Sequence, residues 1–93
     1  MTKFTTRVEL HDGESDDYEK LHGAMEKQGF SRYIADSKGN RYHLPTAEYN
    51  YDGTATRDEV LSKAKTAAKS TGLEFEVIVT ESVARVWHNL KAK

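Results

Sequence analysis

Histidine is the residue type in this sequence best suited to proton transfer, because its ordinary pKa lies near neutral pH. The chain of 93 residues has four histidines: His11, His22, His43 and His88. No two of them have the spacing of a zinc site and cysteine is absent, so the pattern does not indicate a metal centre. His22 could act as a general acid or base in RNA cleavage, where the 2′-hydroxyl is the nucleophile. The alternative is a partly buried packing residue, and His11 and His43 are open to the same two interpretations.

Asp12 is the second candidate for a catalytic group. It ends a predicted strand, where a carboxylate at the edge of a sheet can polarise water or bind Mg²⁺. Asp12-Gly13 is also a common turn pair, which gives a purely structural alternative. One carboxylate is a poor metal site unless a dimer brings two Asp12 side chains together. We therefore expect no resident metal and no cofactor.

Several cations and one aromatic residue could bind RNA. Lys3, Arg7 and Arg32 could contact phosphates, and Tyr33 could stack on a base. The alternative for Lys3 and Arg7 is a solvated sheet face with ion pairs to glutamates of the last strand. The 14 Lys and Arg residues are balanced by 15 Asp and Glu residues, for a formal net charge of −1. Any RNA binding must therefore depend on a local basic patch.

An apolar stripe near the C-terminus predicts a last helix that begins near Ser82. The stripe consists of Val83, Val86, Trp87 and Leu90. One interpretation is a partner surface formed by Trp87, Val83 and Ile78, since exposed apolar stripes mark interaction sites. The other is a helix that folds back on its own sheet.

Two periodicities set out the elements that must position these residues. Alternation of apolar and polar residues predicts strands over 3–11, 30–35, 41–51 and 73–80. Apolar residues spaced by three and four predict helices over 15–28, 56–71 and 82–90. Pro45 predicts a break in the third strand, because proline cannot donate to a ladder. Thr56 and Glu59 form a capping-box pattern at the start of the second helix.

The order β-α-β-β-α-β is typical of the ferredoxin-like α+β fold. It predicts one domain over residues 1–93, with two helices on one face of a four-stranded antiparallel sheet and a short C-terminal helix. The other sheet face is expected to be open and to carry Lys3, Arg7 and His11. No apolar run approaches the ~18 residues of a membrane span, and the N-terminus lacks the apolar segment of a signal peptide. We therefore expect a cytoplasmic protein that does not contact membranes.

The chain resembles the GhoS family, the endoribonuclease antitoxins of type V toxin–antitoxin systems, almost from end to end. The matching residues are Lys3, Phe4, Thr6, Asp12, Met25, Phe30, Ser31, Ala35, Asp36, Gly39, Thr80, Glu81, Ser82 and Trp87. The family is similar in fold to the small nucleases of CRISPR adaptation. The resemblance implies cleavage of the messenger RNA of a small membrane toxin. His22 stands where the family has an arginine tied to cleavage, and Asp12 matches the acidic position that the CRISPR nucleases use for metal.

We therefore predict an endoribonuclease of antitoxin type that binds and cleaves the messenger RNA of a small toxin. His22 would be the acid or base, with Asp12 as a polarising or metal-binding group. The alternative is a non-catalytic protein-binding module of a phage or mobile element that inhibits or regulates a partner. RNA, a second copy of the chain in a homodimer, and another protein are the partners under consideration.

Overall fold

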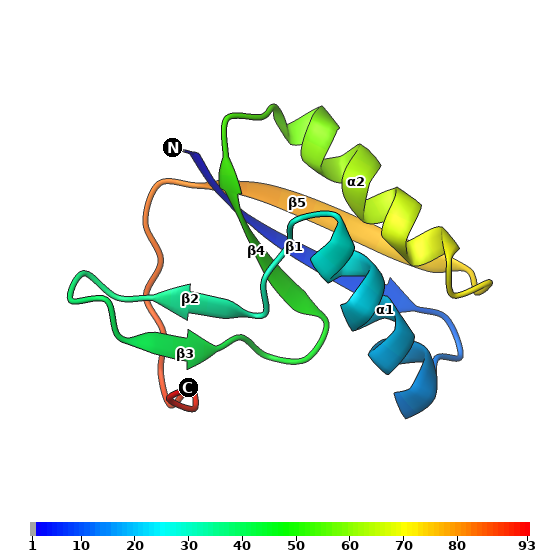
Figure 1. Ribbon diagram of the computed structural model, residues 1–93, viewed down its shortest axis with the longest axis horizontal. Coiled ribbons are helices and arrows are strands. Elements are labelled where there is room, and N and C mark those ends of the chain that lie inside the picture. Colours follow the sequence, from blue (N-terminus) through cyan, green and yellow to red (C-terminus); the bar gives the residue numbers. More distant parts are fainter. Residues whose placement is uncertain (1) are drawn as a thin grey trace.

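The central strand is β1 (Thr2–Leu10) in the computed structural model, which describes residues 2–93. It pairs antiparallel with β4 (Glu48–Gly53) on one side and β5 (Phe75–Ser82) on the other, giving the order β4-β1-β5 (Figure 1). The predicted alternation is confirmed in β1, because Phe4, Thr6, Val8 and Leu10 are all buried. One face of this sheet therefore belongs to the core.

Two helices cover that face, α1 (Ser15–Lys27) and α2 (Arg57–Lys69). Leu21 and Met25 of α1 and Val60 and Ala64 of α2 join the buried side chains of the sheet in one core. The predicted capping box of α2 is confirmed: the Glu59 amide donates to Thr56 Oγ1 at 3.1 Å, and the Thr56 amide donates to Glu59 Oε1 at 2.8 Å. These bonds satisfy backbone donors that a helix N-terminus leaves unpaired.

The N-cap of α1 is Glu14, and its amide donates to Asp17 Oδ2 at 2.9 Å. At the other end of the helix, Gly29 has φ +94, the left-handed conformation that glycine adopts without strain. The chain then turns sharply from α1 towards Phe30 in the core.

A hairpin of β2 (Tyr33–Ala35) and β3 (Arg41–His43) forms a separate two-stranded sheet. A single bridge, Ser31 to Asn50, connects the segment before β2 to the edge of β4. The predicted third strand is interrupted around Pro45, so that β3 pairs with β2 whereas β4 pairs with β1. The molecule is α+β and broadly ferredoxin-like, with a three-stranded and a two-stranded sheet in place of one four-stranded sheet.

The predicted C-terminal helix is wrong: residues 83–93 contain no helix. Figure 1 shows this segment running from β5 back to β3. There the His43 amide donates to the Lys91 carbonyl at 2.8 Å, and the Lys93 amide donates to the Arg41 carbonyl at 2.9 Å. A short helix is marginal by itself, and the free edge of β3 offers backbone partners instead. The Trp87 ring packs on Tyr42, with ring centroids 5.4 Å apart.

Neither helix described for residues 2–93 has the length and apolar content needed to cross a bilayer.

Candidate functional site

A cleft of about 550 Å³ lies between α1 and the hairpin. Four elements and the C-terminal residue contribute to it. Its lining residues are Glu19, His22, Gly23 and Glu26 of α1, Phe30, Ser31, Arg32 and Tyr33 at the start of the hairpin, Arg41 of β3, Tyr49 of β4, and Lys93. The cleft therefore collects side chains that are far apart in the sequence.

His22 and Tyr49 form the buried wall of this cleft. The Nδ1 atom of His22 and the hydroxyl of Tyr49 are hydrogen-bonded at 2.7 Å. His22 is 8% exposed and Tyr49 is fully buried. His22 follows the core residue Leu21 on α1, and its ring packs on Tyr49 of β4 with ring centroids 5.7 Å apart. In residues 2–93 the only fully buried side-chain polar atom without a partner is Thr6 Oγ1, so Nε2 of His22 keeps some contact with solvent.

The surroundings of His22 favour its neutral form. Burial lowers the pKa of His22, and the positive charge of Arg32 lowers it further, against an opposite effect of Glu19. Burial also raises the pKa of Tyr49, so its hydroxyl keeps its proton. A neutral imidazole held by a neutral hydroxyl can accept a proton from a bound substrate at neutral pH.

The lowered pKa of His22 makes the stability of the fold depend on pH. The unfolded chain titrates near the ordinary value of 6.5 and the folded chain below it. As pH falls through 6.5, the unfolded chain takes up the proton first, so the free energy of unfolding decreases until pH passes the folded pKa. When the buffer changes from mildly alkaline to mildly acidic, we expect the free energy of unfolding to fall less for His22→Gln than for the wild type. Chemical denaturation measures both losses, and equal losses would contradict this prediction.

Two cations lie against the ring of Tyr33 at the mouth of the cleft. Lys93 Nζ lies 4.0 Å and Arg41 Cζ lies 5.3 Å from the centre of its ring. The hairpin register places Tyr33 opposite His43, and pairing of the C-terminal residues with β3 brings Lys93 to the ring. Arg32 also lines the cleft, so three cations face the two carboxylates of Glu19 and Glu26. The lining therefore has a formal excess of one cation, in a chain whose formal net charge is −1.

Three of the predicted site residues come together here: His22, Arg32 and Tyr33. Arg41, Tyr49 and Lys93 were not predicted as site residues. Alternation along 41–51 places Tyr49 on an inward face, but no local signal pairs it with a histidine 27 residues earlier. Because a C-terminal helix was expected, the position of Lys93 in the cleft could not be predicted.

Asp12 does not belong to this cleft. It lies exposed in the turn between β1 and α1, with φ 59. Asp is one of the few residue types that tolerate this left-handed conformation, which favours the turn interpretation. In the part of the chain that the structure describes, no group of three or more His, Cys, Asp or Glu side chains is placed to hold a metal ion.

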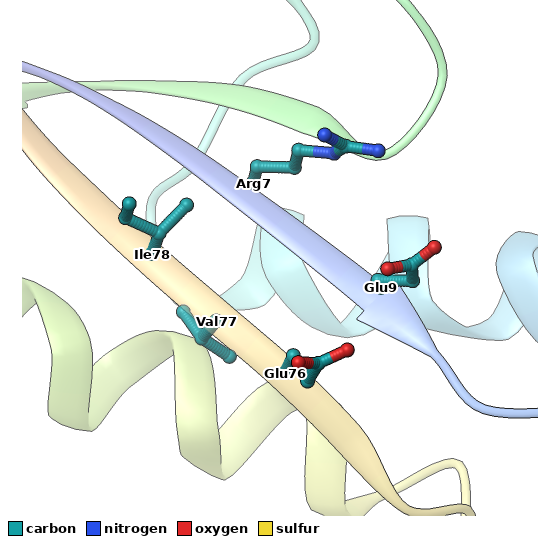
Figure 2. Close-up of a pocket in the computed structure, with 5 residues that line it drawn as sticks. All are labelled: Arg7, Glu9, Glu76, Val77 and Ile78. Carbon is teal, nitrogen blue, oxygen red and sulfur yellow. The ribbon is translucent and has the colours of Figure 1, made fainter.

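Lys3 and Arg7 also lie away from the cleft, on the open face of the main sheet. Figure 2 shows Arg7 and Glu9 of β1 beside Glu76 and Ile78 of β5, around a shallow hollow of about 250 Å³. Lys3 lines another hollow, between the hairpin turn and the segment after β5. The two cations are therefore separate from Arg32.

Among the described residues, the open face has one cross-strand contact to a glutamate of β5, and it is made by His11 rather than by Lys3 or Arg7. His11 Nε2 lies 3.0 Å from Glu76 Oε1. Arg85 crosses part of this face and donates to Thr5 Oγ1 at 3.2 Å and to Asn50 Oδ1 at 2.8 Å. Arg85 is therefore held by partners within the protein, which makes it less available to RNA phosphates.

The residues predicted as a partner surface do not form one apolar stripe. Trp87 is half-buried against Tyr42, whereas Val83 is 104% exposed and Ile78 is 63% exposed. Val86, which the helical pattern grouped with Trp87, is 98% exposed.

A scan against protein-family models gives no match, and a search of the curated proteins gives no relative. The chemistry of the cleft is therefore argued from its own geometry.

Proposed function

We propose that this protein is an endoribonuclease that binds single-stranded RNA in the cleft and uses His22 as its general base. The observation that carries the proposal is the 2.7 Å bond from His22 Nδ1 to Tyr49 beside a mouth lined by Arg32, Arg41 and Lys93. Such a cleft combines an oriented, neutral imidazole with cations that can neutralise a phosphate. These are the components that RNA cleavage through the 2′-hydroxyl needs.

The proton transfer follows from the tautomer of His22. When Nδ1 carries the proton and donates it to the Tyr49 oxygen, Nε2 keeps its lone pair and accepts the 2′-hydroxyl proton. The 2′-oxygen then attacks the adjacent phosphorus, and the bond from phosphorus to the 5′-oxygen breaks. The leaving oxygen takes a proton from protonated His22 or from water. The products are a 2′,3′-cyclic phosphate and a 5′-hydroxyl end.

The substrate class rests on Tyr33 and the three cations. Single-stranded RNA exposes bases that stack on aromatic rings, and Tyr33 lies among cations that can contact the neighbouring phosphates. Duplex RNA is recognised mostly by shape over a long surface, which a cleft of about 550 Å³ does not provide. On the resemblance to the GhoS antitoxins, the target would be the messenger RNA of a small toxin.

The experiment is incubation of a labelled single-stranded RNA with the purified protein, in EDTA and in Mg²⁺, followed by analysis of the product ends. We expect cleavage in both buffers, with cyclic phosphate ends, and the same rate for Asp12→Ala. Cleavage that requires Mg²⁺ and Asp12 would overturn the role of His22. Absence of cleavage under all conditions would overturn the proposal.

The salt dependence of RNA binding tests the phosphate contacts. Three cations give an expected slope of about −2 in a plot of log K against log salt, because each contact to single-stranded RNA contributes about −0.7. We expect Arg41→Ala to make the slope shallower by about 0.7, the contribution of one phosphate contact. Lys38→Ala, in the hairpin turn outside the cleft, should leave the slope unchanged. Fluorescence anisotropy at several salt concentrations measures both. Identical slopes for the two variants would contradict the placement of RNA in the cleft.

A protein-binding module is the second candidate function. Val83, Val86 and Ile78 favour it, since all three are exposed large apolar side chains. This candidate predicts no RNA turnover and a partner whose binding Val83→Asp weakens. A pull-down with the wild type and this variant distinguishes it from the ribonuclease.

A further inference from the structure

Strand β5 leaves one edge of the main sheet free. Among the described residues, β5 pairs only with β1. The His11 amide donates to the Glu74 carbonyl at 2.8 Å, which fixes the alternation of the ladder. Glu76, Ile78 and Thr80 therefore direct their backbone groups to β1. The backbone groups of the intervening residues point outwards from the sheet; these are Phe75, Val77, Val79 and Glu81.

This edge lacks four of the features that usually prevent strand addition. An exposed edge is commonly blocked by proline, lysine, a bulge or a very short strand. β5 has eight residues with no proline and no lysine, and its register with β1 runs without a bulge. Its charged side chains are glutamates only. The edge is therefore open to another extended chain.

Apolar side chains flank the edge on both faces. On the helix side a groove of about 400 Å³ runs between α2 and β5. Its lining combines the apolar Leu61, Val77 and Val79 with Thr56, Arg57 and Asp58. The three apolar side chains are half-buried. On the opposite face Ile78 is 63% exposed, and Figure 2 shows it directed away from Val77. An added strand would cover apolar surface on both sides of the sheet while its backbone pairs with the edge.

We propose that the β5 edge binds the same edge of a second copy of this chain. The two strands would run antiparallel about a twofold axis at Ile78 and form one six-stranded sheet. In this register Val77 lies opposite the partner's Val79, and Phe75 lies opposite the partner's Glu81. All four outward residues of each strand then have partners. An axis at Val77 or Val79 would leave one of them beyond the end of the opposite strand.

The same register is compatible with the charges on β5. Glu76 faces the partner's Thr80, so no glutamate lies directly opposite another glutamate. Ile78 faces the partner's Ile78 at the axis. The edge is therefore complementary to itself, which is the condition for a twofold interface. No residue of β5 lines the cleft of His22, so this interface would leave both clefts accessible.

A matched pair of variants tests the interface and its register. Ile78→Lys would place two ammonium groups face to face at the axis, whereas Thr80→Lys would place the same charge opposite the partner's Glu76. We expect the wild-type mass to rise towards twice 10.5 kDa with increasing concentration in sedimentation equilibrium. We expect Ile78→Lys to weaken dimerisation by about tenfold or more, since like charges repel strongly in an interface, and Thr80→Lys to retain it.

Amide hydrogen exchange provides the second readout. The amides of Val77 and Val79 should become protected as the concentration rises, whereas those of Ile78 and Thr80, which donate to β1, should be protected at every concentration. A monomer at all attainable concentrations, with Val77 and Val79 exchanging freely, would overturn the proposal. A dimer that Ile78→Lys leaves unchanged would also overturn it. Measurements of mass and of hydrogen exchange test the dimer interface independently of whether the protein cleaves RNA.

Discussion

Replacement of His22 by glutamine is expected to reduce RNA cleavage by about 10²–10⁴-fold, the usual contribution of a general base. Glutamine can still form a hydrogen bond with the Tyr49 hydroxyl, which is otherwise held at 2.7 Å by the histidine. It cannot take up a proton from the 2′-hydroxyl. The variant therefore removes the chemistry and keeps the buried partner of Tyr49, so the loss should appear in the rate of cleavage rather than in folding.

The comparison requires a second histidine variant and a check of the fold. His11→Gln makes the same change on the open face, where His11 contacts Glu76 at 3.0 Å. We expect it to cleave RNA at the wild-type rate. Single-turnover kinetics measure the rates, and circular dichroism compares the folds. A wild-type rate in His22→Gln would rule out the proposed base. Equal traces of cleavage in every preparation would indicate a contaminating nuclease.

Replacement of His22 by alanine should have an additional cost in stability. It would leave the buried Tyr49 hydroxyl without its partner, and an unsatisfied buried group costs about 1–3 kcal/mol. The glutamine variant is therefore the cleaner test of chemistry.

Replacement of Phe4 by alanine is expected to lower the free energy of unfolding by about 3–5 kcal/mol, because it removes a large side chain from a packed core. Phe4 is fully buried at the centre of the sheet, and its ring meets Tyr51 edge-on with centroids 6.2 Å apart. Small domains have about 5–15 kcal/mol of stability in total, so this loss is a large part of it.

Denaturation by urea measures the effect of Phe4→Ala, with Lys3→Ala as its control. Lys3 is the preceding residue of β1 and its side chain is exposed, so its replacement should change the free energy of unfolding by no more than about 0.5 kcal/mol. Similar losses in the two variants would contradict the assignment of the buried face of β1.

Elements with strong local signals could be predicted from the sequence. Alternation over 3–11 identified β1 and its buried face, since successive side chains of a strand point to opposite sides. Thr56 and Glu59 identified the start of α2, because a capping box is formed within four residues. Pro45 identified the interruption between β3 and β4, because proline has no amide hydrogen for a ladder. Each of these features depends on neighbours in the chain.

Which residues line the cleft depends on contacts between distant segments, so sequence patterns alone could not predict the full set. His22 could be selected by its chemistry, but its bond to Tyr49 joins α1 to β4, and no periodicity specifies that pair. The C-terminal residues follow a helical spacing, yet pairing with β3 satisfies their backbone and carries Lys93 to Tyr33. A short apolar pattern cannot distinguish these outcomes, because the free edge of β3 exists only after the hairpin has folded. Local sequence patterns thus indicate the α+β class, the main elements and the candidate base. The cations and the hydroxyl around that base follow only from contacts between distant segments.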